Sequence, residues 1–205
     1  MQSYITVKTP AIQTYTIQKS RFISMIRPIQ SLIEANEWLR TVKKEYYRAT
    51  HHCYGFVIDS KILKSSDDGE PSGTAGQPIL EQIQAMNCFF TGIIVIRYYG
   101  GVKLGTGGLV RAYTEGAKLA LDAATMVTMD HSQQLTLYFD YVYFGRLEYE
   151  LRQHAVINEE PIYLDKVIWN IWVSVPTVSN LVAQLQNWTN GQIEIKYGER
   201  TYQPL

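Results

Sequence analysis

The segment GIIVIRYYGGVKLGTGGLVR, residues 92–111, decides the fold of the first half of the chain. Its first part, Gly92–Tyr99, predicts a β-strand, and the run Ile93–Ile96 is apolar on both faces, as is typical of a strand at the centre of a sheet. Five glycines follow, and a helix is expected over Gly107–Ala124. The inner face of that helix consists of small residues, which permit close docking on the sheet: Ala112, Gly116, Ala117, Ala120 and Ala123.

Patterns that precede this segment complete an α/β domain. Arg21–Ile26 alternates like a strand, and Ser31 opens a helix in which Glu34 completes a capping box. Cys53–Ile58 predicts a buried strand, Ser60–Gly76 is too rich in turn formers for a regular element, and Pro78 suits the first turn of a short helix. The helix that Ser31 opens carries an apolar stripe for the sheet: Leu32, Ala35, Trp38, Leu39, Val42 and Tyr46.

The remaining residues repeat a simpler order of elements. Strands are expected over residues 134–143, 157–165, 167–175 and 191–201, with helices over residues 146–155 and after Pro176. The order βαββαβ is that of a ferredoxin-like sandwich. The predicted fold is therefore α+β, with an N-terminal α/β domain over residues 1–130 and a ferredoxin-like domain over residues 131–205.

Composition limits the class of protein. The 205 residues are 46% apolar and 19% charged, which argues against disorder, and the apolar runs are far too short to cross a membrane. Residues 1–130 carry 14 basic and 11 acidic side chains, a net +3, and the rest carry 5 and 8, a net −3. Two cysteines, no signal-peptide pattern and no membrane segment predict a reduced, cytoplasmic protein that does not contact membranes.

The glycine-rich stretch is the first candidate site. Cations and aromatic side chains accompany glycines that let a backbone approach a ligand, a combination that suits phosphate plus base. The spacing matches neither a P-loop nor a dinucleotide fingerprint, and a purely structural glycine turn is the alternative. The candidate nucleic-acid- or phosphate-binding residues are Arg97, Tyr98, Tyr99, Gly100, Gly101, Lys103, Gly105, Gly107, Gly108 and Arg111.

A second candidate is the acidic stretch of residues 65–76, with Asp67, Asp68, Glu70 and Thr74. Crowded carboxylates face water, a cation or basic side chains, so the stretch could orient Arg21, hold Mg²⁺, or be an exposed acidic turn. The backbone N–H groups just before the next helix could hold an anion or a carboxylate. No zinc motif or catalytic motif occurs, so neither a metal ligand set nor a catalytic residue is assigned.

The sequence His51-His52-Cys53 places a base beside a nucleophile. Adjacent strand residues face opposite sides of a sheet, so these residues do not form a dyad. We expect a core cysteine and a surface histidine, with His51 in a supporting role. Cys88 is expected to be buried and inert.

Four blocks of the chain resemble the Impact/YigZ family. They are residues 19–23 (KSRFI), 49–54 (ATHHCY), 66–78 (SDDGEPSGTAGQP) and 97–113 (RYYGGVKLGTGGLVRAY), of which the last two are long and specific. The part from about residue 134 looks like the smaller C-terminal domain of the bacterial members. One departure is His52, where the family often has asparagine.

The resemblance implies a first domain with the fold of a ribosomal protein and of small-molecule kinases. It implies a second domain similar to a domain of elongation factor G. Bacterial members look like nucleic-acid- or ribosome-binding proteins. Eukaryotic relatives regulate translation through a ribosome-associated activator of a stress kinase, but they use an extra N-terminal domain that this chain lacks, so that partner is not transferred.

Two functions follow as expectations. The leading one is a non-enzymatic, cytoplasmic protein that binds RNA or the ribosome and modulates translation. The rival is an enzyme that acts on a phosphorylated small molecule or nucleotide, with the glycine-rich loop on the phosphate and Mg²⁺ or a general base in the acidic loop. In a third reading, the C-terminal domain docks a protein partner.

Overall fold

The computed structural model describes residues 3–154 and 156–204. Its internal contacts divide the chain into two compact units, one over residues 4–127 and the other from Thr128 onward, to which Ser3 also belongs. The boundary expected before His131 lies inside the strand β7 (Thr125–Phe139), which begins in the first unit and ends in the second. Among the described residues, no helix combines the length and the apolar character that crossing a bilayer requires.

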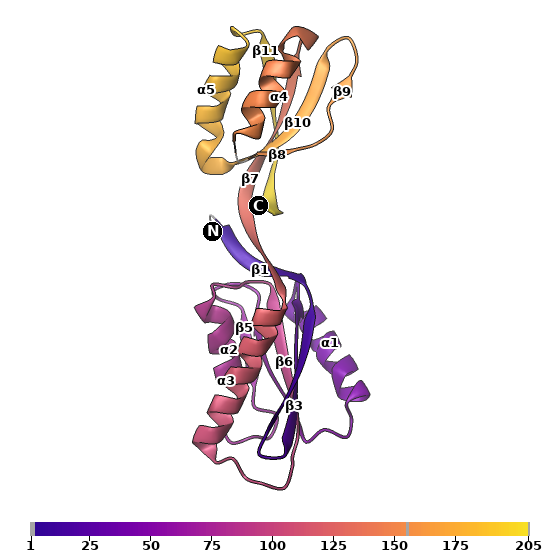
Figure 1. The fold of residues 1–205 in the computed structure, drawn as a ribbon, viewed down its shortest axis with the longest axis vertical. Helices are drawn as coiled ribbons and strands as arrows, with labels where there is room; N and C mark the ends of the chain where they lie inside the picture. Colours follow the sequence, from indigo (N-terminus) through magenta and orange to yellow (C-terminus); the bar gives the residue numbers. More distant parts are fainter. Residues whose placement is uncertain (1–2, 155, 205) are drawn as a thin grey trace. The chain divides into compact units, whose positions relative to one another are not determined.

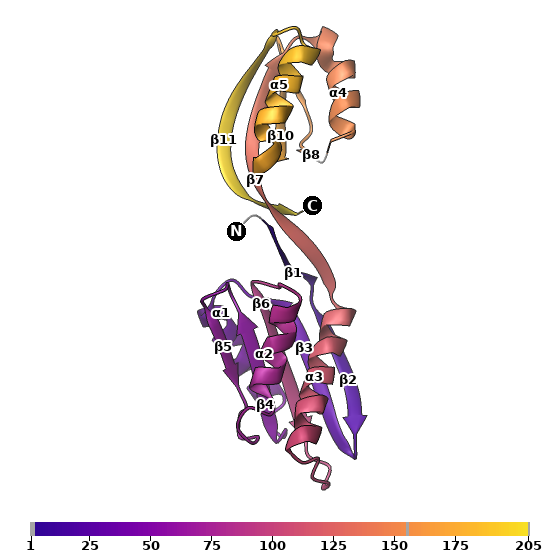
Figure 2. The same ribbon diagram turned by 90° about the vertical axis from the view of Figure 1, so that its left-hand side faces the viewer.

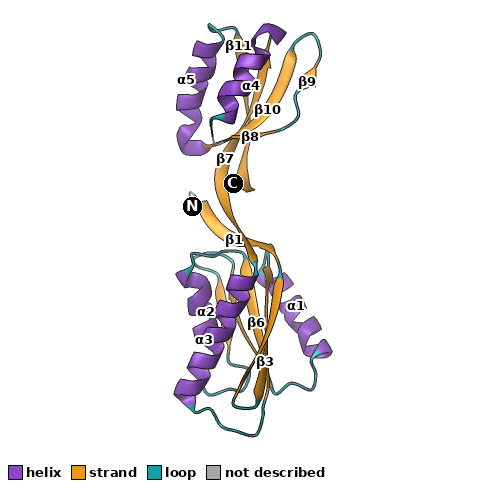
Figure 3. Ribbon diagram, in the orientation of Figure 1, coloured by secondary structure: helices purple, strands orange, loops and turns teal. Residues whose placement is uncertain are grey.

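The first unit is built on a five-stranded sheet, which lies between helices (Figure 3). The strand order is β2 (Ala11–Ile17), β3 (Ser20–Pro28), β6 (Thr91–Tyr98), β4 (His51–Val57) and β5 (Leu63–Ser66), and all neighbours are antiparallel. The predicted central position of the apolar strand is confirmed, because β6 lies in the middle of the sheet and Ile93–Ile96 is fully buried.

The helices α1, α2 and α3 cover this sheet (Figure 2). The helix α1 (Leu32–Glu45) packs on one face, and its predicted cap is confirmed, because Ser31 Oγ accepts the Glu34 N–H at 3.2 Å. The helices α2 (Gly76–Ala85) and α3 (Thr106–Ala123) pack on the other face, in a core that includes both cysteines.

The small-residue face predicted for α3 docks on the sheet, as expected. A Cβ atom at Gly116 would lie 2.2 Å from Tyr15 Oη, and this hydroxyl donates to the Ala112 carbonyl at 2.9 Å. Tyr113, a large residue between the small ones, is also fully buried. The expectation for Ala123 is wrong, because this last residue of α3 is exposed.

Several edge elements were not predicted. They include β1 (Ser3–Thr9) and β2, and β5 lies in the stretch that was expected to lack regular structure. β2 and β3 are joined by Gln18 and Lys19, which both have positive φ (42° and 68°) and form a two-residue hairpin turn. α2 starts at Gly76, two residues before the proline expected in its first turn, because a carboxylate of the chain binds the N–H groups at its start.

The second unit has the predicted ferredoxin-like order of elements. After β7 come α4 (Phe144–Arg152), β8 (Val156–Asn158), β10 (Val167–Ser174), α5 (Val178–Trp188) and β11 (Ile193–Pro204). The strand order β8-β10-β7-β11 places the first and third strands of the motif in the middle, and α4 and α5 cover one face (Figure 2). β1 also hydrogen-bonds to β7.

Details of this unit differ from the expectation. The strand expected over residues 157–165 is instead two short strands, β8 and β9 (Ile162–Tyr163), on different parts of β10. Short 3-10 turns, Tyr141–Tyr143 and Val175–Thr177, precede the two helices, so Pro176 lies before α5 rather than in it. Ala155, the expected end of the first helix, lies outside the described residues.

Candidate functional site

A pocket of the first unit lies where β6 ends and α3 begins (Figure 1 shows these elements). Its volume is about 490 Å³, which is within the usual range for small-ligand sites. The glycine-rich loop and the acidic loop are distant in the sequence, and both contribute to it. The lining residues are Thr50, His51, Glu70, Pro71, Arg97, Tyr99, Lys103, Leu104, Gly105, Thr106 and Leu109.

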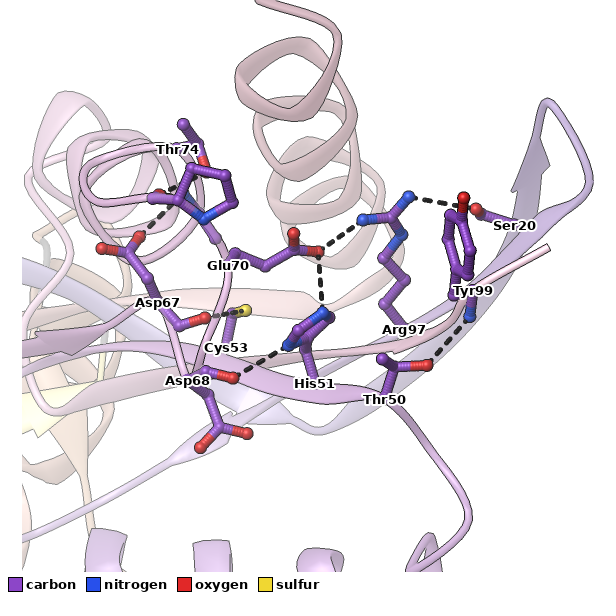
Figure 4. A network of polar contacts seen from close by, with 12 residues as sticks. Ser20, Thr50, His51, Cys53, Asp67, Asp68, Glu70, Thr74, Arg97 and Tyr99 are labelled. Atoms are coloured by element: carbon purple, nitrogen blue, oxygen red, sulfur yellow. Dashed lines mark hydrogen bonds and ion pairs between the residues drawn. The ribbon is translucent and has the colours of Figure 1, made fainter. Parts of the chain in front are cut away.

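Arg97 is buried at the base of this pocket. It is 4% exposed and lies in register with His51 on β4 and Phe22 on β3, so the three side chains share the sheet face that α2 and α3 cover. Its Nη1 donates to Glu70 Oε1 at 2.7 Å and its Nη2 to Ser20 Oγ at 3.1 Å, as Figure 4 shows. Its guanidinium also lies 5.5 Å from the ring centre of Tyr99. Arg97 therefore links Glu70 and Ser20 at the base of the pocket, and it also places a positive charge there.

Glu70 is the buried partner of Arg97. Its Oε1 atom accepts from Arg97 and also from the Tyr113 hydroxyl at 2.7 Å, and the Nε2 atom of His51 lies 3.8 Å from it. Burial, then the neighbouring Cys53 and Glu70, raise the pKa of Tyr113, so its hydroxyl stays protonated as the donor. Tyr113 and Ser20 were not assigned to the site from the sequence. Tyr113 had one signal, since it is the large residue in a helix face of small ones.

His51 is held by the backbone of the acidic loop. Its Nδ1 atom lies 2.9 Å from the Asp68 carbonyl oxygen (Figure 4). A carbonyl oxygen can only accept, so Nδ1 carries a hydrogen, and the opposite nitrogen, Nε2, faces Glu70 Oε1 at 3.8 Å. His51 is part-buried, whereas its neighbour His52 is buried on the opposite face of the strand. The expectation of no His–Cys dyad rested on this alternation.

The glycine-rich loop begins and ends at positions that require glycine. A Cβ atom at Gly100 would lie 2.0 Å from the Lys19 carbonyl oxygen, and Gly105, the residue that caps α3, has φ 71°. Gly101 also has positive φ, and Gly107 and Gly108 lie in the first turn of α3. The first N–H of α3 to bond within the helix belongs to Leu109, which donates to Gly105 at 2.9 Å. The N–H groups of the three residues before it have no partner within the helix.

Lys103 is the exposed cation of this loop. Within residues 3–154 and 156–204, its ammonium group makes no hydrogen bond or ion pair with another side chain. It lines the pocket together with Gly105 and Thr106 at the start of α3. A free ammonium group and the end of a helix that favours negative charge therefore lie beside one pocket.

Other predicted residues of the site are placed elsewhere. Arg111 is exposed on α3 and lines a different hollow, with Gln18 and Glu115. Tyr98 faces the α1 side of the sheet, where the guanidinium of Arg21 lies 4.4 Å from its ring centre. Among the described residues, the ion pairs of the acidic loop do not include Arg21, so the expected pairing is corrected.

The Asp67 carboxylate serves the fold. Its Oδ1 accepts from the N–H groups of Ala75 and Gly76 at 2.9 and 2.8 Å, and its Oδ2 from Gly73 at 2.9 Å. Burial by itself raises the pKa of Asp67, but these three hydrogen bonds outweigh it, so the pKa lies below its ordinary value. The carbonyl of Asp67 also accepts from the buried thiol of Cys53 at 3.0 Å.

The other polar residues of the acidic loop also have partners within the chain. Asp68 accepts from the His52 N–H and from Lys43 Nζ, both at 2.7 Å, and the Thr74 hydroxyl donates to the Pro71 carbonyl at 2.6 Å. The carboxylates of Asp67, Asp68 and Glu70 thus bind three different sets of groups. Within the described part of the chain, no group of three histidine, cysteine or acidic residues has the arrangement of a metal site. No metal was assigned from the sequence, and Mg²⁺ at this loop stays one of the alternatives that the sequence left open.

The fold and the pocket define a two-domain α+β protein whose first domain has a pocket at one end of its sheet. The model of the Impact N-terminal domain matches residues 18–121, and a domain of unknown function (DUF1949) matches residues 137–192. The chain belongs to the IMPACT family, as the sequence blocks predicted.

Relatives cover both domains. The chain is 36% identical to the IMPACT family member YvyE of Bacillus subtilis over 98% of its own length and 94% of the relative's. It is 33% identical to the IMPACT family member YigZ of Escherichia coli, over 95% and 98%. A crystal structure of a hypothetical protein, 32% identical, superposes with a TM-score of 0.62 over 97% of this chain and 98% of the other.

Proposed function

We propose that this IMPACT-family protein binds single-stranded RNA through the pocket and modulates translation at the ribosome without catalysing a reaction. The observation that carries the proposal is the lining of the pocket, which combines Lys103 and Arg97 with the ring of Tyr99. A cation for phosphate beside an aromatic face for a base is the usual combination in proteins that bind single strands.

Each group has a separate role in this proposal. Lys103 and the first N–H groups of α3 would hold one phosphate, because both favour negative charge. Tyr99, whose side chain is 46% exposed, would stack one base. Arg97 is too deeply buried to hold a phosphate at the surface, so it would act as a positioning residue that fixes Tyr99 and Glu70.

The cellular location and a protein partner of the C-terminal domain belong to the same proposal. We place the protein in the cytoplasm, where ribosomes and RNA are found. The C-terminal domain would dock a protein partner, and its exposed apolar residues Tyr141, Val142, Ile162, Tyr163 and Leu164 are compatible with that role.

Binding to a labelled single-stranded RNA of 12 nucleotides, measured by fluorescence anisotropy at several salt concentrations, tests the proposal. Lys103→Ala should weaken binding about 10-fold and reduce the slope of log affinity against log salt by about 0.7, as expected for one lost contact to a single strand. Tyr99→Ala should weaken binding about 10-fold or more through lost stacking.

Arg111→Ala is the matched control, since it removes a cation of the same domain that lies outside the pocket. Its affinity should equal that of the wild type. Equal affinities for the Lys103 and Arg111 variants would contradict the proposed site. Salt-sensitive co-sedimentation with ribosomes, lost in Lys103→Ala, would connect the site to translation, and wild type that stays in the supernatant at low salt would contradict that connection.

One observation favours the second candidate, an enzyme acting on a phosphorylated small molecule. Glu70 of the acidic loop and residues 103–106 of the glycine-rich loop line the same pocket, so an acidic group and a phosphate site meet there. A Mg²⁺-dependent rise in melting temperature with nucleotides, in the absence of RNA binding, would favour this candidate.

A further inference from the structure

We infer that an RNA strand bound in the pocket continues around the end of β6 onto the α1 side of the sheet, where a second nucleotide site lies. The site is an arginine–tyrosine patch that consists of Arg21, Tyr98, Tyr47 and Arg48. This inference rests on the proposed binding of RNA and extends it from one pocket to a path across the sheet end.

The first pair of the patch is Arg21 with Tyr98. The two residues lie opposite each other on β3 and β6, and the guanidinium is 4.4 Å from the ring centre of Tyr98. Arg21 is exposed, and within residues 3–154 and 156–204 it makes no hydrogen bond or ion pair. Its N–H donors are therefore available to a phosphate, while the ring of Tyr98 holds the charge in position.

The second pair is Tyr47 with Arg48, in the segment that links α1 to β4. The Arg48 guanidinium lies 5.4 Å from the ring centre of Tyr47, and its Nε donates to the Tyr47 hydroxyl at 2.9 Å. Tyr47 is 69% exposed, so most of its surface is available to a ligand. An exposed ring next to a guanidinium is the kind of surface on which proteins stack unpaired bases.

Tyr46 joins the two pairs into one patch. Burial raises the pKa of its hydroxyl, and the nearby Glu45 and Tyr98 add to the rise. Arg21 is also close enough to affect this pKa, which it lowers, and Tyr47 follows Tyr46 directly in the chain. Glu45 is the acidic neighbour, and the two arginines of the patch outnumber it. The patch thus combines net positive charge with aromatic rings, as the pocket does.

The patch and the pocket meet at the end of β6. Tyr98 and Tyr99 are consecutive and face opposite sides of the sheet, so one aromatic ring lies on each side of the strand end. The Thr50 hydroxyl, at the edge of the pocket, accepts the Tyr99 N–H at 3.1 Å (Figure 4). The Thr50 N–H donates to the Arg97 carbonyl at 2.8 Å. The segment from Tyr46 to Thr50 is therefore tied to the end of β6 and connects the patch with the pocket.

The residues that follow Tyr99 offer backbone rather than side chains to a strand that crosses here. Gly100 and Gly101 have no side chain, and a Cβ atom at Gly101 would meet nothing within 4 Å. The space beside this turn is therefore open, and a nucleic-acid backbone can approach it closely. Lys19, in the hairpin turn between β2 and β3, lies next to Gly100 and adds an exposed cation.

A second site makes the effect of the patch depend on the length of the RNA. Each phosphate contact to a single strand contributes about 0.7 to the slope of log affinity against log salt, so Arg21 and Arg48 together should contribute about 1.4. Stacking on Tyr47 should contribute about 10-fold to affinity. A dinucleotide held in the pocket is too short to cross the sheet end, so it should gain nothing from the patch.

The test measures a labelled 12-nucleotide RNA by fluorescence anisotropy and a dinucleotide of the same sequence by competition with it. Arg21→Ala/Arg48→Ala should weaken binding of the long strand at least about 10-fold, lower its salt slope by about 1.4, and leave the dinucleotide unchanged. Tyr47→Ala should weaken the long strand about 10-fold, whereas Tyr47→Phe, which keeps the ring, should bind like the wild type.

Arg111→Ala/Lys118→Ala is the matched control. It also removes two exposed cations of the first domain, but both lie on α3, which packs on the opposite face of the sheet from α1. The affinities for both strands should equal those of the wild type. Because the net charge changes equally in the two double variants, a difference between them reports the position of the cations and not their number.

The outcomes separate this inference from the proposal beneath it. If Arg21→Ala/Arg48→Ala binds the long strand as the control does, while Lys103→Ala weakens it, RNA binding through the pocket stands and the second site is overturned. The second site is also overturned if the double variant weakens both strands equally, because the patch would then act only through the pocket. If the wild type binds neither strand, both proposals fail.

Discussion

The two helices on one face of the first sheet begin in opposite ways. At the start of α2, the Asp67 carboxylate accepts the N–H groups of Ala75 and Gly76. At the start of α3, the capping residue is Gly105, which has no side chain, and the pocket with Lys103 lies beside the first turn. At the N-terminus of α2, the chain itself supplies the stabilising negative charge. The N-terminus of α3 is instead open to a negative charge from a ligand. An acidic run in a sequence can therefore be structural, and a glycine run can leave the start of a helix without a side-chain cap.

The largest test of this comparison removes the internal carboxylate. Asp67→Ala should lower the free energy of unfolding by about 2–4 kcal/mol, because three backbone donors lose a charged acceptor and α2 loses its cap. Denaturant unfolding measures the change. Asp122→Ala, which removes an exposed carboxylate of α3, should stay within about 0.5 kcal/mol of the wild type. A loss as small as that of the control would mean that Asp67 does not hold the start of α2.

Lowering the pH should have a smaller effect on the stability of the domain. The pKa of Asp67 is below its usual value of 3.8 in the folded chain, so below pH 3.8 the unfolded chain binds a proton that the folded chain does not. The stabilisation by Asp67 is complete above pH 3.8 and is lost as the pH falls through the folded pKa. Melting temperatures between pH 5 and pH 2 should therefore fall less steeply for Asp67→Asn than for the wild type. Parallel curves would contradict this assignment.

The smallest effect on stability is expected at the open helix. Thr106→Asp places a carboxylate at the first residue of α3 and should raise the free energy of unfolding by about 0.3–1 kcal/mol. The same charge should repel a phosphate, so RNA binding should fall while stability rises. The neutral variant Thr106→Asn is the control for shape. If Thr106→Asp binds RNA as well as Thr106→Asn does, the phosphate does not lie at this helix end.

Much of the fold could be predicted, because burial imposes periodic patterns. The central strand β6 and the small-residue helix α3 are examples, and so is the βαββαβ order of the second domain. The edge strand β2 could not, since its residues are largely exposed and Ile12, at 60% exposure, interrupts any inward pattern. Edge strands form because a neighbour offers hydrogen bonds, and this information is not local in the sequence.

The site was predicted less completely. Both Tyr98 and Tyr99 were assigned to the site, although adjacent strand residues face opposite sides of a sheet, and only Tyr99 joins Arg97. The exposed Lys103, which was assigned to phosphate binding, lines the pocket, and its role stays a prediction. The burial of Arg97 was not predictable, because its partners Ser20 and Glu70, and Tyr113, which also donates to Glu70 Oε1, come from three distant parts of the chain. Charge alone does not reveal whether an arginine is paired.

The thiol of Cys53 hydrogen-bonds to Asp67 in the core, and Cys88 is buried in the same core, at 0% and 1% exposure. Burial raises the pKa of Cys88 to about 11 and also raises that of Cys53. Thiolates are the reactive form, so both cysteines resist alkylation while the domain is closed. Modification by a small thiol reagent then proceeds only through transient opening. The rates at which Cys53 and Cys88 are modified therefore report local unfolding of the domain. The rate at Cys53 also reports opening of the acidic loop, because its thiol is hydrogen-bonded to Asp67.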